Sequence, residues 1–323
     1  MAEPLVSICV PTIGRLEYLP EVRASLAAQT FRDYEVLVLD NASPPEAREQ
    51  LERWAKKEPR VRLLRVEERV PMFRNFKRGI EQTRGRYVTF CHDDDAMGGD
   101  FLRRNVDFMQ AHPDVVFAGC NYDLIDEKSR LVENRAWIRR TEVWSDRRYI
   151  RTLVRRGRNP ITMQSVFYRR EELAAGWDDT ITPHFGDFVI LMRMAEGRSV
   201  GLIAETLTRV RHHDGQASKW TLSRGIPLRT EVLLAYCREL SLRWPASDVA
   251  ALERDVRRAH ALYLAWGWLS APDRQEAEAC LAGLDRSGVE AGLAKVMRAF
   301  DKLGSLPDAR RRVASVVRRV ANR

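Results

Sequence analysis

The stretch Arg86-Tyr-Val-Thr-Phe-Cys-His-Asp-Asp-Asp95 decides how this chain is interpreted. Its first six residues are mostly apolar, which is typical of a short buried strand. The three adjacent carboxylates that follow repel one another unless a positive group lies among them, and a divalent cation with oxygen ligands is a common partner. Because open α/β sheets bind ligands at the carboxyl ends of their strands, the stretch indicates a metal–phosphate site. The alternative for three aspartates alone is a solvated acidic turn.

Outward from this stretch, the first 120 residues alternate between two patterns. Short apolar, β-branched runs predict strands at 6–10, 35–39, 61–65, 87–91 and 115–120. Amphipathic runs predict helices at 16–29, 45–57, 73–83 and 100–112. Strands that alternate with helices favour βαβ units, so we predict an α/β fold whose mostly parallel sheet is flanked by helices.

The later part of the chain changes character near residue 220. Before that point the patterns predict further strands at 164–169, 200–204 and 207–211 and a helix at 187–196. Beyond it only helical periodicity remains, at 228–243, 248–269, 274–284 and 290–303. We therefore predict two domains, residues 1–220 with the sheet and residues 221–323 as an all-α appendage.

Composition limits the class of protein. The 323 residues carry 54 basic and 45 acidic side chains, a net charge of +9, which favours an anionic partner such as nucleotide phosphate, anionic lipid or nucleic acid. No apolar run approaches the roughly 20 residues of a membrane span, and the first residues lack the layout of a signal peptide. Five cysteines without ligand-like spacing predict reduced thiols in a cytoplasmic protein.

Four further polar residues lie at expected strand or helix ends. Asp40 ends the second strand and suits either base binding or a helix cap. Arg74 suits a pyrophosphate contact or a plain surface position on a helix. Asp187 suits a general base or an N-terminal cap, and His213 suits a metal ligand or a polar turn. Each residue taken alone leaves both interpretations open.

Together, these sites occur in an order that resembles the inverting glycosyltransferases of family 2, which have the GT-A (Rossmann-like) fold. The resemblance is carried by Val6-Ser-Ile-Cys-Val-Pro-Thr-Ile-Gly-Arg15, by residues 25–35 and by Val38-Leu-Asp-Asn-Ala-Ser43. It continues through residues 159–161, 167–170, 176–177, 186–187 and 211–218, so it covers about residues 4–220. The helical residues beyond lie outside it.

The resemblance implies a role for each site residue. It implies that the nucleotide pocket is lined by Pro11, Thr12 and Arg15, with Asp40 on the base, Arg74 near the diphosphate and Asp93 near the ribose. It implies a Mn²⁺ or Mg²⁺ ion on Asp94, Asp95 and His213, with Asp94 as principal ligand. It also implies that Asp187 is the catalytic base.

Two positions depart from the family pattern. His92 stands where the family often has Asp, which leaves the register of the family's DxD element open within residues 92–95. Gly186 precedes Asp187 where the family often has a second acid, so one carboxylate is left for the base role.

The predicted activity is transfer of a sugar from a nucleoside-diphosphate sugar to a hydroxyl of a glycan, glycolipid or other acceptor in bacterial polysaccharide or glycoconjugate synthesis. One alternative is a nucleotidyltransferase, although residues 11–15 are not the Gly-rich basic loop of such enzymes. The other is a basic nucleic-acid-binding module, which the absence of interleaved aromatic platforms disfavours, so no nucleic acid partner is expected.

The last residues form a basic amphipathic pattern. Residues 307–323 carry six arginines and one aspartate, and Val313, Val316, Val317 and Val320 recur at helical spacing. Such a helix suits the surface of an anionic membrane, which predicts peripheral contact with the inner face of the membrane. The alternative is a helix docked on its own domain or on a second copy of the chain in a homo-oligomer.

Overall fold

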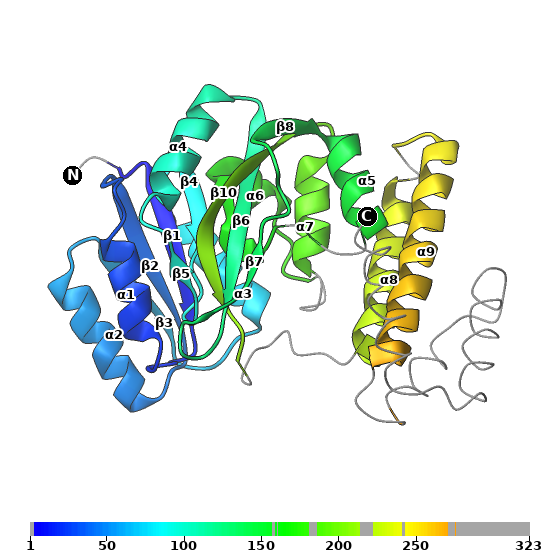
Figure 1. Ribbon diagram of the computed structural model, residues 1–323. Coiled ribbons are helices and arrows are strands. Elements are labelled where there is room, and N and C mark those ends of the chain that lie inside the picture. Colours follow the sequence, from blue (N-terminus) through cyan, green and yellow to red (C-terminus); the bar gives the residue numbers. More distant parts are fainter. Residues whose placement is uncertain are drawn as a thin grey trace. The chain divides into compact units, whose positions relative to one another are not determined.

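The computed structural model describes residues 3–156, 159, 161–180, 186–213, 222–240, 243–270 and 275. The chain divides into two compact units, residues 1–149 with 160–216, and residues 150–159 with 217–323. The first unit contains the sheet, and the second contains α8 and α9 (Figure 1). The assignment of residues 1–220 and 221–323 as separate domains stays a prediction.

One mixed sheet forms the first unit. The strand order is β3-β2-β1-β4-β9-β6-β10-β5, with β7 paired to β6 and β8 paired to β10. Its strands are β1 (Val6–Thr12), β2 (Tyr34–Asn41), β3 (Val61–Val66), β4 (Tyr87–Phe90), β5 (Ala96–Met97), β6 (Val115–Ile125), β7 (Leu131–Arg135), β8 (Glu142–Ser145), β9 (Val166–Arg169) and β10 (Ser199–Arg211).

Strands β1 to β4 are parallel to one another, because each returns through a helix. The residues of β1, β2 and β4 are almost continuously buried, as expected of parallel strands covered on both faces, whereas β3 at the edge is mostly only partly buried. In this register Thr12 lies beside Asp40, so the carboxyl ends of β1 and β2 meet at one edge of the sheet. The predicted mostly parallel α/β sheet is confirmed for this half.

The other half of the sheet is mixed. Strand β9 is antiparallel to both β4 and β6, whereas β10 is parallel to β6 and antiparallel to β5 and β8. The two predicted strands 200–204 and 207–211 are a single strand, β10, with irregular pairing between Ile203 and Thr208. A bulge of this kind interrupts the alternation of side chains without ending the strand.

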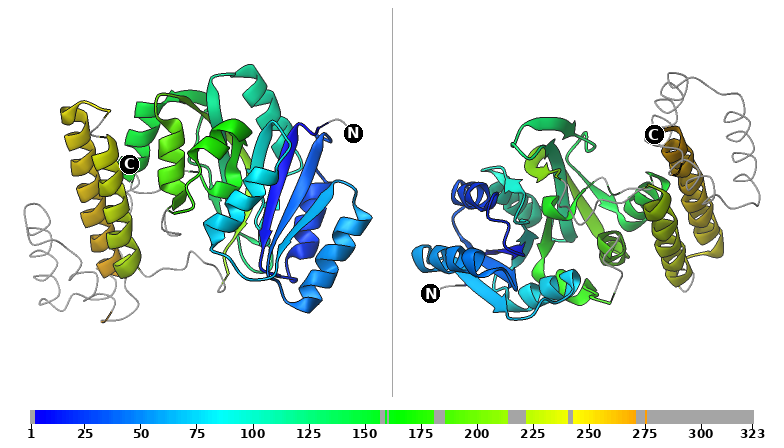
Figure 2. Two further views of the ribbon diagram at one scale, coloured as in Figure 1. Left: turned by 180° about the vertical axis from the view of Figure 1, so that it is seen from behind. Right: turned by 90° about the horizontal axis from the view of Figure 1, so that it is seen from below.

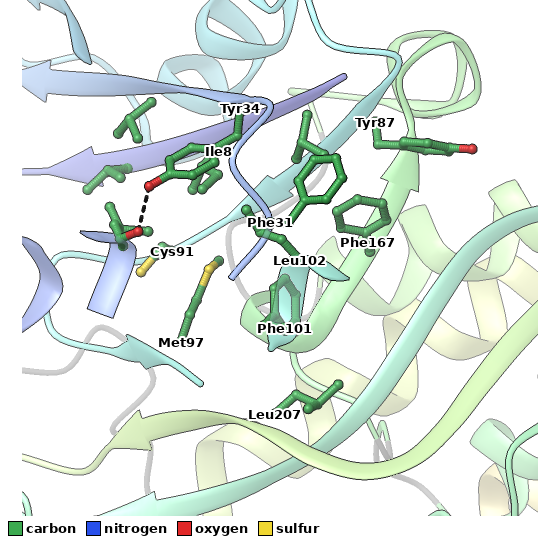
Figure 3. Close-up of a cluster of buried hydrophobic side chains, with 14 of the residues drawn as sticks. Ile8, Phe31, Tyr34, Tyr87, Cys91, Met97, Phe101, Leu102, Phe167 and Leu207 are labelled. Atoms are coloured by element: carbon green, nitrogen blue, oxygen red, sulfur yellow. Dashed lines mark hydrogen bonds between the residues drawn. The ribbon is translucent and has the colours of Figure 1, made fainter. Parts of the chain in front are cut away.

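Helices cover both faces of the sheet (Figure 2). Helices α1, α2 and α4 contribute to the cluster of buried side chains on one face, and α3 and α6 pack on the other. Val6, Ile8 and Val10 alternate toward the first cluster, which also contains Tyr87 and Phe167 (Figure 3). The helices of this unit are α1 (Leu19–Ala27), α2 (Pro45–Lys57), α3 (Met72–Gln82), α4 (Phe101–Ala111), α6 (Arg170–Gly176) and α7 (Gly186–Ala195), with a 3-10 turn at Met163–Ser165.

Helix α5 (Asp146–Arg156) begins in the first unit and continues into the second. The second unit contains α8 (Leu222–Leu240) and α9 (Ala246–Ser270), which pack side by side. Leu233 and Leu240 of α8 and Leu252 and Val256 of α9 are buried. These helices agree with the helical periodicity beyond residue 220. Apart from residue 275, the predicted helices 274–284 and 290–303 and the basic tail lie outside the described residues. No helix in the described part of the chain is long and apolar enough to span a bilayer.

Candidate active site

The acidic triplet lies where β4 ends. Strand β4 stops at Phe90, residues 91–95 form a turn, and β5 begins at Ala96. Because β1, β2 and β4 are parallel, this turn lies at the same edge of the sheet as the ends of β1 and β2. All three aspartates are buried, with at most 7% of each residue exposed. The fold therefore keeps three carboxylates inside the protein, so each needs a compensating partner.

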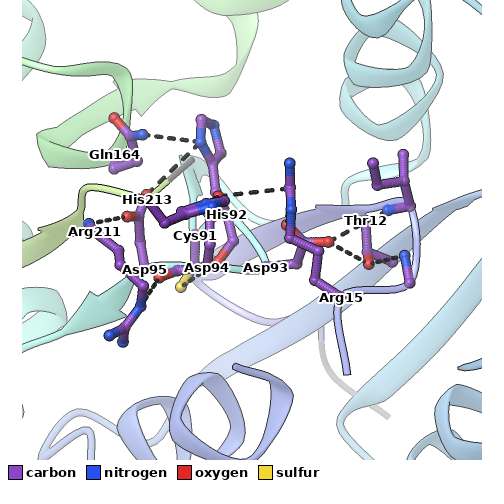
Figure 4. A network of polar contacts seen from close by, with 12 residues as sticks. Thr12, Arg15, Cys91, His92, Asp93, Asp94, Asp95, Gln164, Arg211 and His213 are labelled. Atoms are coloured by element: carbon purple, nitrogen blue, oxygen red, sulfur yellow. Dashed lines mark hydrogen bonds and ion pairs between the residues drawn. The ribbon is translucent and has the colours of Figure 1, made fainter. Parts of the chain in front are cut away.

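Asp93 is held by the loop that follows β1. Thr12 donates its hydroxyl to Asp93 Oδ2 at 2.6 Å, and Arg15 Nη1 lies 2.9 Å from Asp93 Oδ1 (Figure 4). The main-chain N–H of Ile13 also donates to this carboxylate, at 3.3 Å. Burial opposes the charge of Arg15, but its ion pairs with Asp93 and Asp94 raise the pKa of the guanidinium. The predicted residues Thr12, Arg15 and Asp93 thus lie together.

Asp94 lies between two groups that bear or can accept positive charge. His213 Nε2 is 3.0 Å from Asp94 Oδ2, and Arg15 Nη1 is 3.5 Å from the same oxygen. The imidazole of His213 is also buried, and its ring centre is 5.4 Å from that of Tyr18. The structure therefore brings His213, 119 residues away in sequence, onto the residue predicted as the principal metal ligand.

Asp95 is tied to the end of β10 through one of its two carboxylate oxygens. The main-chain N–H of Arg211 donates to Asp95 Oδ1 at 2.8 Å. The other oxygen, Oδ2, is buried without a hydrogen-bond partner among the described residues. Burial and the charge of Asp94 raise the pKa of the Asp95 carboxyl well above its ordinary value. A cation beside Asp94 and Asp95 would stabilise the ionised carboxylate of Asp95 against burial and against the charge of Asp94.

His92 is a member of the site that the sequence left without a role. Its Nδ1 lies 2.9 Å from Gln164 Nε2 and 3.7 Å from Asp95 Oδ2. Burial lowers the pKa of His92, which favours the neutral imidazole that a metal requires. Ligand atoms of His92, Asp94 and Asp95 all lie within 4.8 Å of one another. The position of His92 directly before the triplet could have indicated that it belongs to the site, whereas nothing in the sequence indicated Gln164.

The residues present fit a divalent cation. The carboxylates of Asp94 and Asp95 and the imidazole of His92 supply a mixed oxygen and nitrogen donor set, which suits Mn²⁺ at least as well as Mg²⁺. The imidazole of His213 lies outside that cluster but contacts Asp94 Oδ2. The buried Oδ2 of Asp95, which lacks a hydrogen-bond partner among the described residues, supports the same conclusion. The metal identity stays a proposal.

Asp40 is fully buried at the end of β2 and already has partners. Arg65 Nη1 lies 2.8 Å from Asp40 Oδ2, and the main-chain N–H of Ser43 donates to Asp40 Oδ1 at 2.9 Å. Pro11 precedes Thr12 within β1 and is partly exposed. Both residues lie at the edge of the sheet that carries the triplet, and their predicted contacts with a nucleotide stay predictions.

Arg74 lies on the exposed side of α3 and is not among the residues that contact the triplet. Lys77, and to a smaller extent Arg74, lower the pKa of Asp179. The predicted diphosphate contact of Arg74 therefore has no support in the described contacts and stays a prediction.

Asp187 is the second residue of α7 and is partly buried. Burial raises the pKa of its carboxyl, although hydrogen bonds from the main chain at Phe188 and Asp187 oppose the rise. Its negative charge in turn contributes to the raised pKa of buried Tyr149 and Tyr168, which burial itself raises most. Asp187 is thus an acidic residue in the first turn of α7 with reduced solvation. This position is compatible both with a general base and with a helix cap.

Comparison with known proteins decides the family. The model of glycosyl transferase family 2 matches residues 7–175, more than half of the chain. The chain belongs to glycosyltransferase family 2. The match contains the triplet and the residues of β1 that hold Asp93, but it ends before α7 and β10.

A named relative agrees with this membership. A Bacillus subtilis (strain 168) protein named as a teichuronic acid biosynthesis glycosyltransferase, TuaG, is 27% identical over 107 residues, which are 33% of this chain and 42% of TuaG. The match spans less than half the length of this and another curated relative, 42% and 21% respectively.

Two solved structures share the fold. TarS of S. aureus, residues 1–349, in complex with UDP-GlcNAc, has a TM-score of 0.64 at 17% identity and covers 98% of this chain and 90% of its own. The mannosyltransferase PcManGT from Pyrobaculum calidifontis, in complex with GDP-Man and Mn²⁺, has a TM-score of 0.56 at 17% identity, over 99% and 87% of the two chains. The family member described here therefore has the predicted GT-A fold.

Proposed function

We propose that this protein is a metal-dependent inverting glycosyltransferase that moves a sugar from a nucleoside-diphosphate sugar to an acceptor hydroxyl. The observation that carries the proposal is the buried triplet, in which Asp93 meets Thr12 and Arg15 while Asp94 meets His213. Membership of glycosyltransferase family 2 supports it, as do two fold neighbours that were solved with UDP-GlcNAc and with GDP-Man and Mn²⁺.

Asp94 and Asp95, with an imidazole from His213, would hold Mn²⁺ or Mg²⁺. The bound ion would offset negative charge on the leaving nucleoside diphosphate. Asp93 would face the ribose beside Thr12 and Arg15, and Asp40 would face the base. Arg15 can approach the donor phosphates because 22% of its side chain stays exposed while its guanidinium contacts Asp93.

Asp187 would remove the proton from the acceptor hydroxyl as that oxygen attacks the anomeric carbon from the face opposite the leaving group. The attacking oxygen forms the new bond to this carbon while the bond to the diphosphate oxygen breaks. A single displacement of this kind inverts the centre and needs no covalent sugar–enzyme intermediate. The partly buried position of Asp187 supports the role, because reduced solvation makes a carboxylate a stronger base.

The acceptor that we propose is a glycan or glycolipid of the bacterial envelope, and we place the enzyme in the cytoplasm with its basic C-terminal tail at the membrane. The name of TuaG, which refers to teichuronic acid, supports a polysaccharide acceptor. The charge of the tail supports the membrane contact.

The proposal is tested by incubating the protein with UDP-GlcNAc, UDP-glucose and GDP-mannose, each with Mn²⁺ or with EDTA. Release of UDP or GDP that requires the metal is the expected result, and NMR of the liberated or transferred sugar should show an inverted anomeric centre. Retention of configuration would overturn the mechanism. Release of pyrophosphate from a nucleoside triphosphate, with no reaction of any nucleotide sugar, would instead indicate a nucleotidyltransferase.

A further inference from the structure

Arg211 ends β10 directly opposite the triplet. In the antiparallel pairing of β10 with β5, Thr208 lies beside Met97 and Arg209 beside Ala96. Two residues further along, the same register places Arg211 opposite Asp94. The acidic turn and the end of β10 are therefore neighbours through the continuation of one ladder.

The side chain of Arg211 is completely buried and contacts three separate segments. Its Nε donates to the carbonyl oxygen of Asp94 at 2.8 Å. Its Nη1 donates to the carbonyl oxygen of Asp126 and to the hydroxyl of Ser129, each at 2.9 Å, in the turn between β6 and β7. Its Nη2 forms an ion pair with Glu21 of α1.

Burying a guanidinium carries a large desolvation penalty, and the contacts of Arg211 offset this penalty only when all of them are formed. Its charge is balanced by Glu21, and its plane lies over the ring of Tyr18, 4.5 Å from the ring centre. A lysine in this position would place a single point charge on a flexible side chain. The planar guanidinium of arginine instead donates several hydrogen bonds in fixed directions. These contacts therefore require the guanidinium of an arginine at position 211. Within the site, that guanidinium fixes the main-chain carbonyl of Asp94.

Asp95 is fixed by the same residue through the main chain, since the N–H of Arg211 donates to Asp95 Oδ1. Arg211 thus fixes both the main-chain carbonyl of Asp94 and the carboxylate of Asp95. The side-chain charges of these two neighbouring aspartates repel each other. His213, two residues further on, contacts the carboxylate of Asp94.

We propose that Arg211 is a positioning residue for metal binding, which holds Asp94 and Asp95 in the arrangement that receives the cation and anchors them to α1 and to the β6–β7 turn. This inference rests on the proposed function, because it assigns the metal to those carboxylates. Arg211 would act through Asp94 and Asp95 and not as a ligand of the metal.

The experiment measures Mn²⁺ affinity by EPR titration of free Mn²⁺, with UDP and separately with GDP present, in the full chain. Arg211→Lys should weaken Mn²⁺ binding roughly 10- to 100-fold, the usual effect of losing a group that orients metal ligands. The matched control is Arg169→Lys. Arg169, in β9 of the same sheet, donates to the carbonyl oxygens of Met109, His112 and Val115, away from the triplet.

Arg169→Lys should lose thermal stability like Arg211→Lys but bind Mn²⁺ within about twofold of the wild type. Equal weakening by both substitutions, or unchanged affinity in Arg211→Lys, would overturn the positioning role. If Arg211→Lys does not fold, Glu21→Gln decides, because it leaves Arg211 in place without its counter-charge. It should weaken Mn²⁺ about two- to fivefold, as expected for a partly exposed ion pair, and an unchanged affinity would refute the role.

A wild type that binds no Mn²⁺ with either nucleotide is a separate outcome. It would refute the metal-dependent function together with the role of Arg211. An intact Mn²⁺ site that is insensitive to Arg211 refutes the positioning role alone.

Discussion

Asp187→Asn separates catalysis from folding at a single position. Asparagine has the shape of aspartate and also caps helices, so the start of α7 should be preserved. It cannot accept a proton from an acceptor hydroxyl, and a positioned base typically contributes about 10²–10⁴-fold. At about 1.36 kcal/mol for each factor of ten, this corresponds to about 2.7–5.4 kcal/mol of transition-state stabilisation.

The stability of the same variant has a predictable sign. Burial raises the pKa of Asp187 in the folded state above its unfolded value, so the folded protein binds more protons between those two values. The free energy of unfolding of the wild type therefore falls as pH rises through that window. Asparagine does not titrate, so the variant should match or exceed the wild type in Tm at neutral pH, and this gain should disappear in acid below the usual aspartate range.

Asp178→Asn is the matched control, with the opposite sign. A hydrogen bond from the Thr180 hydroxyl, with further help from Arg193 of α7 at 2.9 Å, lowers the pKa of Asp178. That carboxylate stabilises the fold above its unfolded pKa, and the stabilisation is lost as pH falls through the folded value. The control should lose Tm at neutral pH and keep its transfer rate.

The assays are steady-state transfer, donor binding by calorimetry, and thermal melts between pH 4 and 8. We expect Asp187→Asn to bind the donor normally and to lose transfer. A loss of transfer below tenfold would refute the base assignment and leave Asp187 as a helix cap. A rate profile of the wild type that does not rise with pH through the carboxylate range would also contradict it.

Four further predictions concern the donor site, the packing of the sheet and the tail. Asp94→Asn should weaken Mn²⁺-dependent donor binding, measured by calorimetry with and without EDTA, while the circular dichroism spectrum stays unchanged; equal donor affinity with and without metal in both proteins would contradict the assignment. Asp40→Ala should weaken all donors through the base and leave discrimination between sugars on one nucleotide unchanged, so altered sugar preference in a competition assay would place Asp40 at the wrong end of the donor. Gly79→Ala would put a Cβ 2.3 Å from Leu39 Cδ1, and such overpacking should cost about 1–3 kcal/mol in urea unfolding, an expectation that an unchanged midpoint would refute. Protein that ends at residue 307 should sediment with anionic vesicles less than the full chain at equal salt, and equal sedimentation would exclude the tail as the anchor.

Most of the parallel half of the sheet could be predicted because β1, β2 and β4 are buried on both faces and leave largely apolar runs. Val36–Leu39 and Tyr87–Phe90 have this pattern, and the structure confirms both. The edge strands β7 and β8 have exposed or partly exposed residues and gave no such signal. Helix α5 was missed because six of its eleven residues are charged, which resembles a solvated loop.

The site shows the same division. The triplet was predictable because crowded carboxylates at a strand end are informative even without a partner. The partners of the triplet were less predictable. Gln164 lies 72 residues from His92 in the sequence. The contacts of buried Arg211 depend on the register of β10 with β5, which no local sequence pattern specifies. Asp40 was predicted as a ligand contact, but its ion pair with Arg65 required the pairing of β2 with β3.

The position of β10 sets a lower limit on the part of the chain that can be produced as a fragment. The sequence match to the family stops at residue 175, yet β10 lies between β6 and the edge strand β5 and also pairs with β8. A fragment cut at the end of that match would leave the edge of β6 unpaired, with β5 and β8 deprived of their neighbour, and unpaired edges invite aggregation. Expression of this fold in isolation should therefore extend at least through His213, and insoluble product from shorter fragments would reflect a missing strand and not an unstable sequence.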